Sequence, residues 1–122
     1  MSRACILVLP TCPSVNHYWV TARGRFYISE RGQAYRDKVI VLCLQAKKEQ
    51  SVGVFTGRVA VDIVFHPPDK HRRDLDNTLK GLLDALAHGG VYNDDSQVDD
   101  LRIRRGKITK GGEVVVTVSA LL

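Results

Sequence analysis

Two aspartates separated by one residue stand where a strand is expected to give way to a helix. The segment reads Arg72-Arg73-Asp74-Leu75-Asp76-Asn77. In an extended backbone, residues i and i+2 lie on the same side of the chain, so the carboxylates of Asp74 and Asp76 can share a face. Two carboxylates that close repel each other unless they share a proton, lie beside cations or hold a metal ion. Oxygen-only ligands would select Mg²⁺ or Mn²⁺ over zinc.

A second pair of acids, Asp94 and Asp95, follows the expected second helix. If that helix packs back against the sheet, its ends could bring the two acidic motifs near each other. Lys80 lies one turn beyond Asp76, where its ammonium can tune the carboxylates or reach a phosphate oxygen. Asp also commonly caps helices and fills polar turns. The spacing therefore leaves a metal site and a set of structural aspartates both open.

Hydrophobic patterning predicts the elements that must position these residues. Apolar runs and alternation indicate strands at residues 5–9, 58–66, 101–108 and 113–121. Helical spacing indicates a first helix after Ser29 as N-cap and a second from about residue 77 to 88. We therefore expect one α+β domain, residues 1–122, with a mixed sheet of about four strands and two main helices. Its order is strand, helix, strand, helix, strand, strand.

The connecting segments carry signals of their own. Residues 13–29 are basic and aromatic without a sustained period, and are expected to form a loop. Thr109–Gly112 is a hairpin turn signal, so the last two strands are expected to pair antiparallel. In the strand at 101–108, alternation predicts Leu101 and Ile103 inward, with Arg102 and Arg104 outward.

Composition narrows the class of protein. A chain of 122 residues is too short for two independent domains. Eighteen Lys and Arg against 13 Asp and Glu give a net charge of +5, which favours a polyanionic partner. The apolar runs are too short for a membrane span and the N-terminus has no export signal, so we expect a cytoplasmic location. The three cysteines, Cys5, Cys12 and Cys43, have no metal or disulfide spacing and are expected to be reduced and buried.

The motifs follow the order found in one known family. They are Pro13–Asn16, Arg23-Gly24-Arg25, Gly32–Arg36, Lys70–Asn77, Lys80, Asp84-Ala85-Leu86, Asn93–Val98 and Thr109–Gly112. Together they span nearly the whole chain, which resembles the RusA-type Holliday junction resolvases.

This resemblance implies a homodimer that binds four-way DNA junctions and makes paired, symmetric nicks with Mg²⁺, for which Mn²⁺ substitutes. It assigns the essential carboxylates to Asp74, Asp76 and Asp95 and the essential lysine to Lys80. Asp94 matches a neighbouring acid. It further implies that the protein is encoded by a bacterium or by a prophage. No protein partner other than a second copy of the chain is implied.

Contact with DNA is expected from basic residues beside the acids and in the loops. They are Lys70, Arg72, Arg73, Arg23, Arg25, Lys107 and Lys110, with the outward Arg102 and Arg104. Tyr18, Trp19 and Tyr92 are candidates either for stacking on unpaired bases or for the core. Two other functions stay open: a nuclease acting on other branched DNA, and a branched-DNA-binding module without catalysis.

Overall fold

The computed structural model describes residues 4–121 and has the predicted α+β architecture. The strands are β1 (Ala4–Leu9), β2 (Trp19–Ala22), β3 (Arg25–Ile28), β4 (Val59–His66), β5 (Val98–Arg105) and β6 (Glu113–Ala120). The α-helices are α1 (Val15–Tyr18), α2 (Glu30–Gln50) and α3 (Leu79–His88), and the 3₁₀ turns are η1 (Leu75–Thr78) and η2 (Asp95–Gln97). The expected domain bounds also include residues 1–3 and 122, which lie outside the described part.

The main sheet has four strands in the order β1-β6-β4-β5. Strand β6 pairs antiparallel with both β1 and β4, whereas β5 pairs parallel with β4. The predicted hairpin between the last two strands is therefore wrong. Local turn chemistry is present, since Gly111 and Gly112 have positive φ and the Gly112 amide donates to Thr109 at 2.8 Å. After this turn, however, β6 pairs with β4 on the edge of β4 opposite to β5.

Side-chain chemistry explains why β6 is central and β5 is at the edge. Val114, Val116 and Val118 of β6 are buried, as suits a strand paired on both sides. Strand β5 carries acidic and arginine side chains that need solvent, which is typical of an edge strand. At that edge Leu101 is 41% exposed, so its predicted inward burial is wrong.

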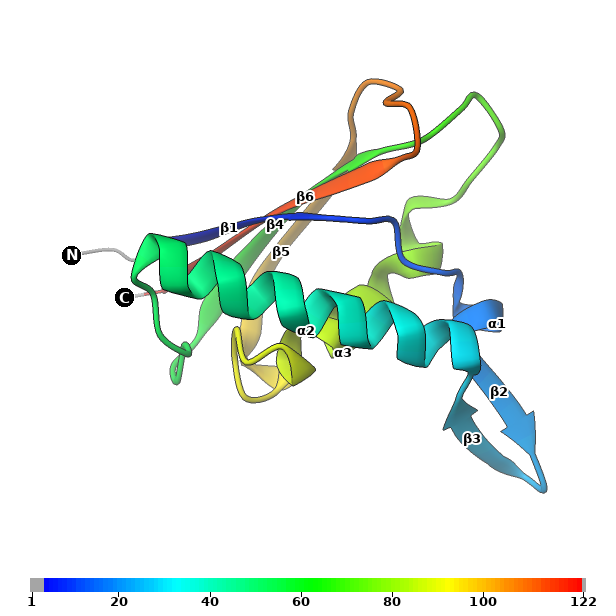
Figure 1. Ribbon diagram of the computed structural model, residues 1–122, viewed down its shortest axis with the longest axis horizontal. Helices are drawn as coiled ribbons and strands as arrows, with labels where there is room; N and C mark the ends of the chain where they lie inside the picture. Colours follow the sequence, from blue (N-terminus) through cyan, green and yellow to red (C-terminus); the bar gives the residue numbers. More distant parts are fainter. Residues whose placement is uncertain (1–3, 122) are drawn as a thin grey trace.

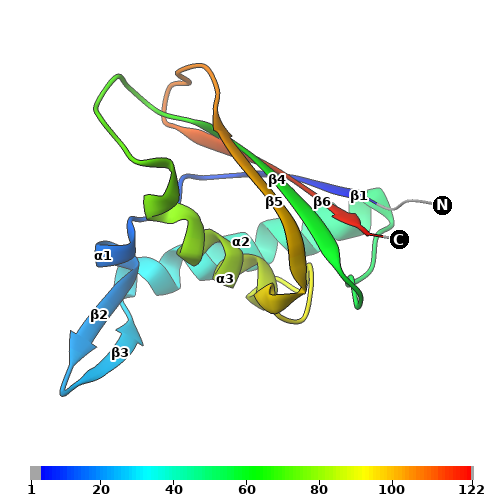
Figure 2. The same ribbon diagram turned by 180° about the vertical axis from the view of Figure 1, so that it is seen from behind.

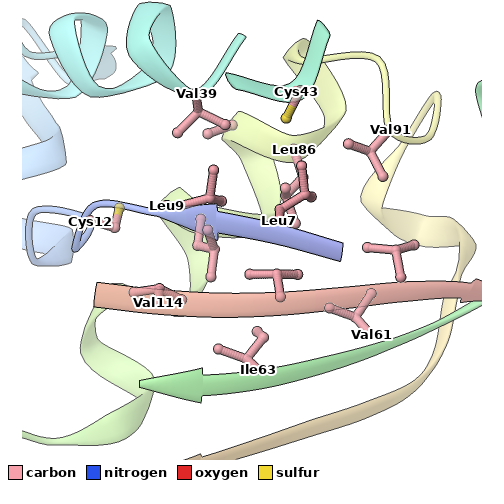
Figure 3. Packing of buried hydrophobic residues seen from close by; sticks show 14 of the residues in the cluster. Leu7, Leu9, Cys12, Val39, Cys43, Val61, Ile63, Leu86, Val91 and Val114 are labelled. Atoms are coloured by element: carbon pink, nitrogen blue, oxygen red, sulfur yellow. The ribbon is translucent and has the colours of Figure 1, made fainter. Parts of the chain in front are cut away.

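Helices α2 and α3 both lie against one face of the main sheet (Figures 1 and 2). Figure 3 shows Leu7 and Leu9 of β1 beside Val39 of α2 and Leu86 of α3. The predicted N-cap is confirmed, because the Ser29 hydroxyl accepts the Gly32 amide at 2.9 Å. No helix among residues 4–121 is long and apolar enough to cross a membrane.

All three cysteines are buried free thiols, as predicted. Burial raises the pKa of Cys12 and Cys43 to about 12. Both therefore remain neutral thiols that fill the core.

The segment predicted to be a loop instead contains a second sheet. Strands β2 and β3 form an antiparallel hairpin that projects from the body (Figures 1 and 2). Arg23 and Gly24 both have positive φ, 52° and 74°, the conformation of a two-residue type I′ turn. The usual sequence signal for this turn is Asn-Gly or Asp-Gly, so the Arg-Gly pair does not reveal it.

The buried face of α3 allows a test of the core. Leu86 is fully buried, and truncating such a leucine costs hydrophobic transfer energy and leaves a cavity. We expect Leu86→Ala to lower the free energy of unfolding by about 3 kcal/mol, measured by urea denaturation. Leu44→Ala, at a position 56% exposed, is the matched control and should lie within about 0.5 kcal/mol of wild type. Equal effects at the two positions would contradict this core.

Candidate active site

Asp74 and Asp76 lie in the connection between β4 and α3. Asp74 precedes η1 with extended backbone angles, φ −87° and ψ 136°, and its side chain makes no capping hydrogen bond. Asp76 lies within η1, and both residues are exposed. Within residues 4–121 neither carboxylate has a hydrogen bond or ion pair to protein. The capping alternative is therefore not supported for either residue.

The acid pair lines an open hollow of about 570 Å³, and arginine side chains line it as well. Arg72, Arg73 and Arg105 line it together with the two aspartates. Three guanidinium groups in one open hollow can attract a phosphate group.

The loop that carries this pair is held in place by a third aspartate, Asp69. The Asp69 carboxylate accepts a hydrogen bond from Arg73 Nη1 at 2.7 Å and from the His71 amide at 2.9 Å. These hydrogen bonds hold the pKa of Asp69 well below its usual value of 3.8, and the bond from Arg73 has the largest effect. Arg105 of β5 donates to the Arg73 carbonyl at 2.6 Å. Arg73 is therefore occupied in positioning the loop, whereas Arg72 is exposed.

Asp95 is presented by η2, next to an aspartate with a structural role. Asp94 caps η2, accepting the Ser96 amide at 2.9 Å, and forms a capping box with Gln97. The pKa of Asp94 is lowered by this amide hydrogen bond. Asp95 has a raised pKa, first from burial and then from the neighbouring Asp94. The two adjacent acids thus differ, because Asp94 caps η2 whereas Asp95 interacts with the Asp94 carboxyl group.

Gln97 anchors this turn to the rest of the protein. Its side-chain oxygen accepts the amides of Asn93 and Asp94 at 2.8 and 2.9 Å. Its side-chain nitrogen donates to the carbonyls of Phe55 and Gly57 at 2.9 and 2.8 Å. One buried amide side chain therefore fixes η2, and with it Asp95, against the segment that joins α2 to β4.

Asp95 lines a different hollow from the acid pair. This second hollow, of about 720 Å³, also contains Lys80 and Asp84. Asp84 accepts from the Tyr18 hydroxyl at 2.7 Å and from Arg36 Nη2 at 2.8 Å, which compensates its charge. Sequence reasoning did not assign a role to Asp84, although its place four residues after Lys80 puts both on one helix face.

The structure therefore brings Lys80 and Asp95 together, and separately Asp74 and Asp76. Among the residues that the structure describes, no three His, Cys, Asp or Glu side chains are grouped so that they could hold a metal ion. The assignment of Asp74, Asp76 and Asp95 to one metal site stays a prediction.

Comparison with known proteins places this arrangement in a family. The model of the endodeoxyribonuclease RusA family matches residues 9–119. The chain belongs to the RusA family. Crossover junction endodeoxyribonuclease of Enterobacteria phage HK97 is 43% identical over 115 residues, which are 93% of this chain and 92% of that protein. The enzymes of that name from Shigella sonnei (strain Ss046) and Escherichia coli (strain K12) are 40% and 39% identical, each over 94% of this chain and 93% of theirs.

Family membership confirms the resemblance and the enzyme class read from the sequence, an endodeoxyribonuclease. In this RusA-family chain the basic residues form two regions. Lys70 and Arg72 lie in the loop after β4, and Lys107 and Lys110 in the loop after β5, and both loops rise at one end of the main sheet (Figures 1 and 2). Arg23 and Arg25 lie on the projecting hairpin. All six are exposed.

Of the aromatic residues considered for base stacking, two belong to the core of this RusA-family fold. Tyr18 and Tyr92 are fully buried, and the Tyr92 hydroxyl donates to the Leu83 carbonyl at 2.7 Å. Trp19 is half-buried and lies under Lys80, whose ammonium is 5.8 Å from the ring centre. Only Trp19 of these three remains available to a ligand.

The Asp69–Arg73 pair yields a prediction in acid. Because the pKa of Asp69 is lower in the folded chain than in the unfolded one, the pair stabilises the loop above about pH 4. This contribution is lost as the pH falls through the folded pKa. We expect Arg73→Ala to raise the Asp69 pKa toward 3.8, measured by NMR titration of its carboxyl carbon. Arg72→Ala, the neighbouring control, should leave that pKa unchanged; an equal shift in both variants would contradict the pairing.

The Gln97 anchor yields a prediction of stability. Gln97→Ala leaves buried amides and carbonyls without partners, so we expect a loss of about 3 kcal/mol in the free energy of unfolding. Urea denaturation measures it, and Gln45→Ala, at an exposed glutamine on α2, is the control. A loss no larger than that of the control would show that η2 is held by other contacts.

Proposed function

We propose that this chain resolves Holliday junctions by hydrolysing phosphodiester bonds in four-way DNA. Three relatives that match over more than nine-tenths of this chain carry the name crossover junction endodeoxyribonuclease. The observation that carries the proposal is the exposed pair Asp74 and Asp76, whose carboxylates have no partner within residues 4–121 and share a hollow with three arginines. Aspartates with a structural role accept hydrogen bonds from the protein, as the carboxylates of Asp69, Asp84 and Asp94 do.

The donor set of this pair fits a divalent cation. Mg²⁺ prefers oxygen ligands and commonly takes one or two carboxylates while keeping several waters. Asp74 and Asp76 supply such oxygens on an open surface, and Asp95 is the proposed third ligand. A bound Mg²⁺, or Mn²⁺ in its place, would activate a water and neutralise charge on the phosphate.

The chain's own residues supply the remaining steps. Lys80 neutralises the charge that develops on the phosphate oxygens or orients the attacking water. Lys70 and Arg72 bind flanking phosphates, whereas Arg73 acts through the loop by holding Asp69. Arg105 of β5 stabilises the same loop through its hydrogen bond to the Arg73 carbonyl.

The proposed working form is a homodimer. A four-way junction can present two equivalent strands, and a two-fold dimer places one active site on each, which accounts for paired, symmetric nicks. The substrate is bacterial or prophage DNA, so we place the enzyme in the cytoplasm. Relatives from phages and enterobacteria support that host range.

Junction cleavage tests the activity itself. We expect the protein to cut a synthetic four-way junction with Mg²⁺ and to leave it intact in a chelator. Flap and duplex substrates of the same arm sequences should be cut far more slowly. Equal cutting of flaps would favour a general branched-DNA nuclease, and binding without cleavage across divalent ions would favour a binding module.

A single substitution separates catalysis from binding. Asp76→Asn removes one charged oxygen ligand and keeps the size of the side chain, so we expect cleavage to fall at least about a thousand-fold, as for loss of a transition-state contact. Junction affinity should stay within about two-fold, because the basic surface is unchanged. Asp37→Asn, at an exposed aspartate of α2, is the control. Retained cleavage in Asp76→Asn would overturn the proposed role.

A further inference from the structure

The projecting hairpin has one face that is aromatic and faces a hollow. Its register pairs Thr21 with Phe26 and Trp19 with Ile28, so these four side chains share a face. Phe26 is 78% exposed, whereas a phenylalanine that belongs to a hydrophobic core is mostly buried. Tyr27, the next residue along β3, points to the opposite face.

This face borders the 720 Å³ hollow that contains Asp95. Trp19, Thr21 and Phe26 line one side of it, and Lys80 and Asp84 line the other. The indole nitrogen of Trp19 is buried and has no hydrogen-bond partner among the residues that the structure describes.

The hairpin is anchored firmly enough to act as a platform. Its base is closed by the Ser29 amide, which donates to the Tyr18 carbonyl at 2.9 Å. Gly32 permits this close approach, since a Cβ there would lie 2.4 Å from the Tyr18 oxygen. A rigid platform binds with little loss of conformational freedom.

We propose that this hollow receives an unpaired nucleobase at the branch point of the DNA, stacked on Phe26. The proposal rests on the proposed function. An exposed aromatic side chain beside a hollow suits a base, because the faces of every base can stack on it. Arg23 and Arg25, on the same hairpin, supply the cations for the adjoining backbone.

A second copy of the chain fits this face less well. A two-fold interface centred on this face would bring Arg23 and Arg25 of the two copies close together, and their like charges would repel. In duplex DNA every base is stacked within the helix, whereas a branch point can release one. The hairpin thereby distinguishes branched DNA from duplex.

The experiment combines a protein change with a DNA change. Affinities of wild type and Phe26→Ala are measured by fluorescence anisotropy in chelator at one salt concentration. The probes are a four-way junction, the same junction with abasic sites at the branch point, and a duplex. We expect Phe26→Ala to bind the intact junction about ten-fold more weakly, the scale of one lost base–aromatic stack. Its affinities for the abasic junction and the duplex should equal those of wild type.

Two control variants sharpen the result. Phe26→Trp retains a stacking surface and should retain junction affinity. Tyr27→Ala removes an aromatic residue from the opposite face, 47% exposed, and should change junction affinity less than two-fold. Size-exclusion chromatography with light scattering should show the same oligomeric state for all variants.

Four outcomes would overturn the inference. They are equal weakening on intact and abasic junctions, equal weakening on duplex, full affinity in Phe26→Ala, and a changed oligomeric state, which would assign Phe26 to a contact between copies. The proposed function fails separately, when wild type itself neither prefers nor cuts the junction.

Discussion

Parallel pairing of β4 with β5 is the constraint on which the site depends. Parallel neighbours need a crossover that returns the chain to the same end of the sheet, and here α3 provides it. The acids before α3 therefore lie at one end of the crossover, and Asp95, after it, lies at the other. Asp74 and Asp76 line one hollow, and Asp95 lines another. Lys80, in the first turn of α3, lies beside the hollow of Asp95.

The same pairing brings two basic loops together. Because β4 and β5 run in one direction, the loops after them leave the sheet at the same end (Figure 2). Arg105 at the end of β5 then reaches the Arg73 carbonyl in the loop after β4. The geometry of the acid pair thus depends on an arginine that is 31 residues beyond Asp74 in the sequence.

The aspartates near the proposed site differ in whether the protein engages their carboxylates. Asp69, Asp84 and Asp94 each accept hydrogen bonds from the protein, whereas Asp74 and Asp76 accept none within the described chain. A carboxylate that is satisfied by the protein fixes a loop and has little capacity left for a ligand. An exposed carboxylate that the protein does not engage keeps its oxygens available for a ligand such as a divalent cation.

The sequence by itself determined the features that depend on neighbours along the chain. Alternation predicted β4 and β6, Ser29 was correctly assigned as an N-cap, and the cysteines were correctly assigned to the core. The acid pair and Lys80 were also named from spacing and resemblance. Only the tertiary structure decided which strand β6 pairs with, that Arg73 is held by Asp69, and that Phe26 borders the hollow of Asp95. These depend on contacts between segments far apart in sequence, and local periodicity contains no information on which distant segment a side chain meets.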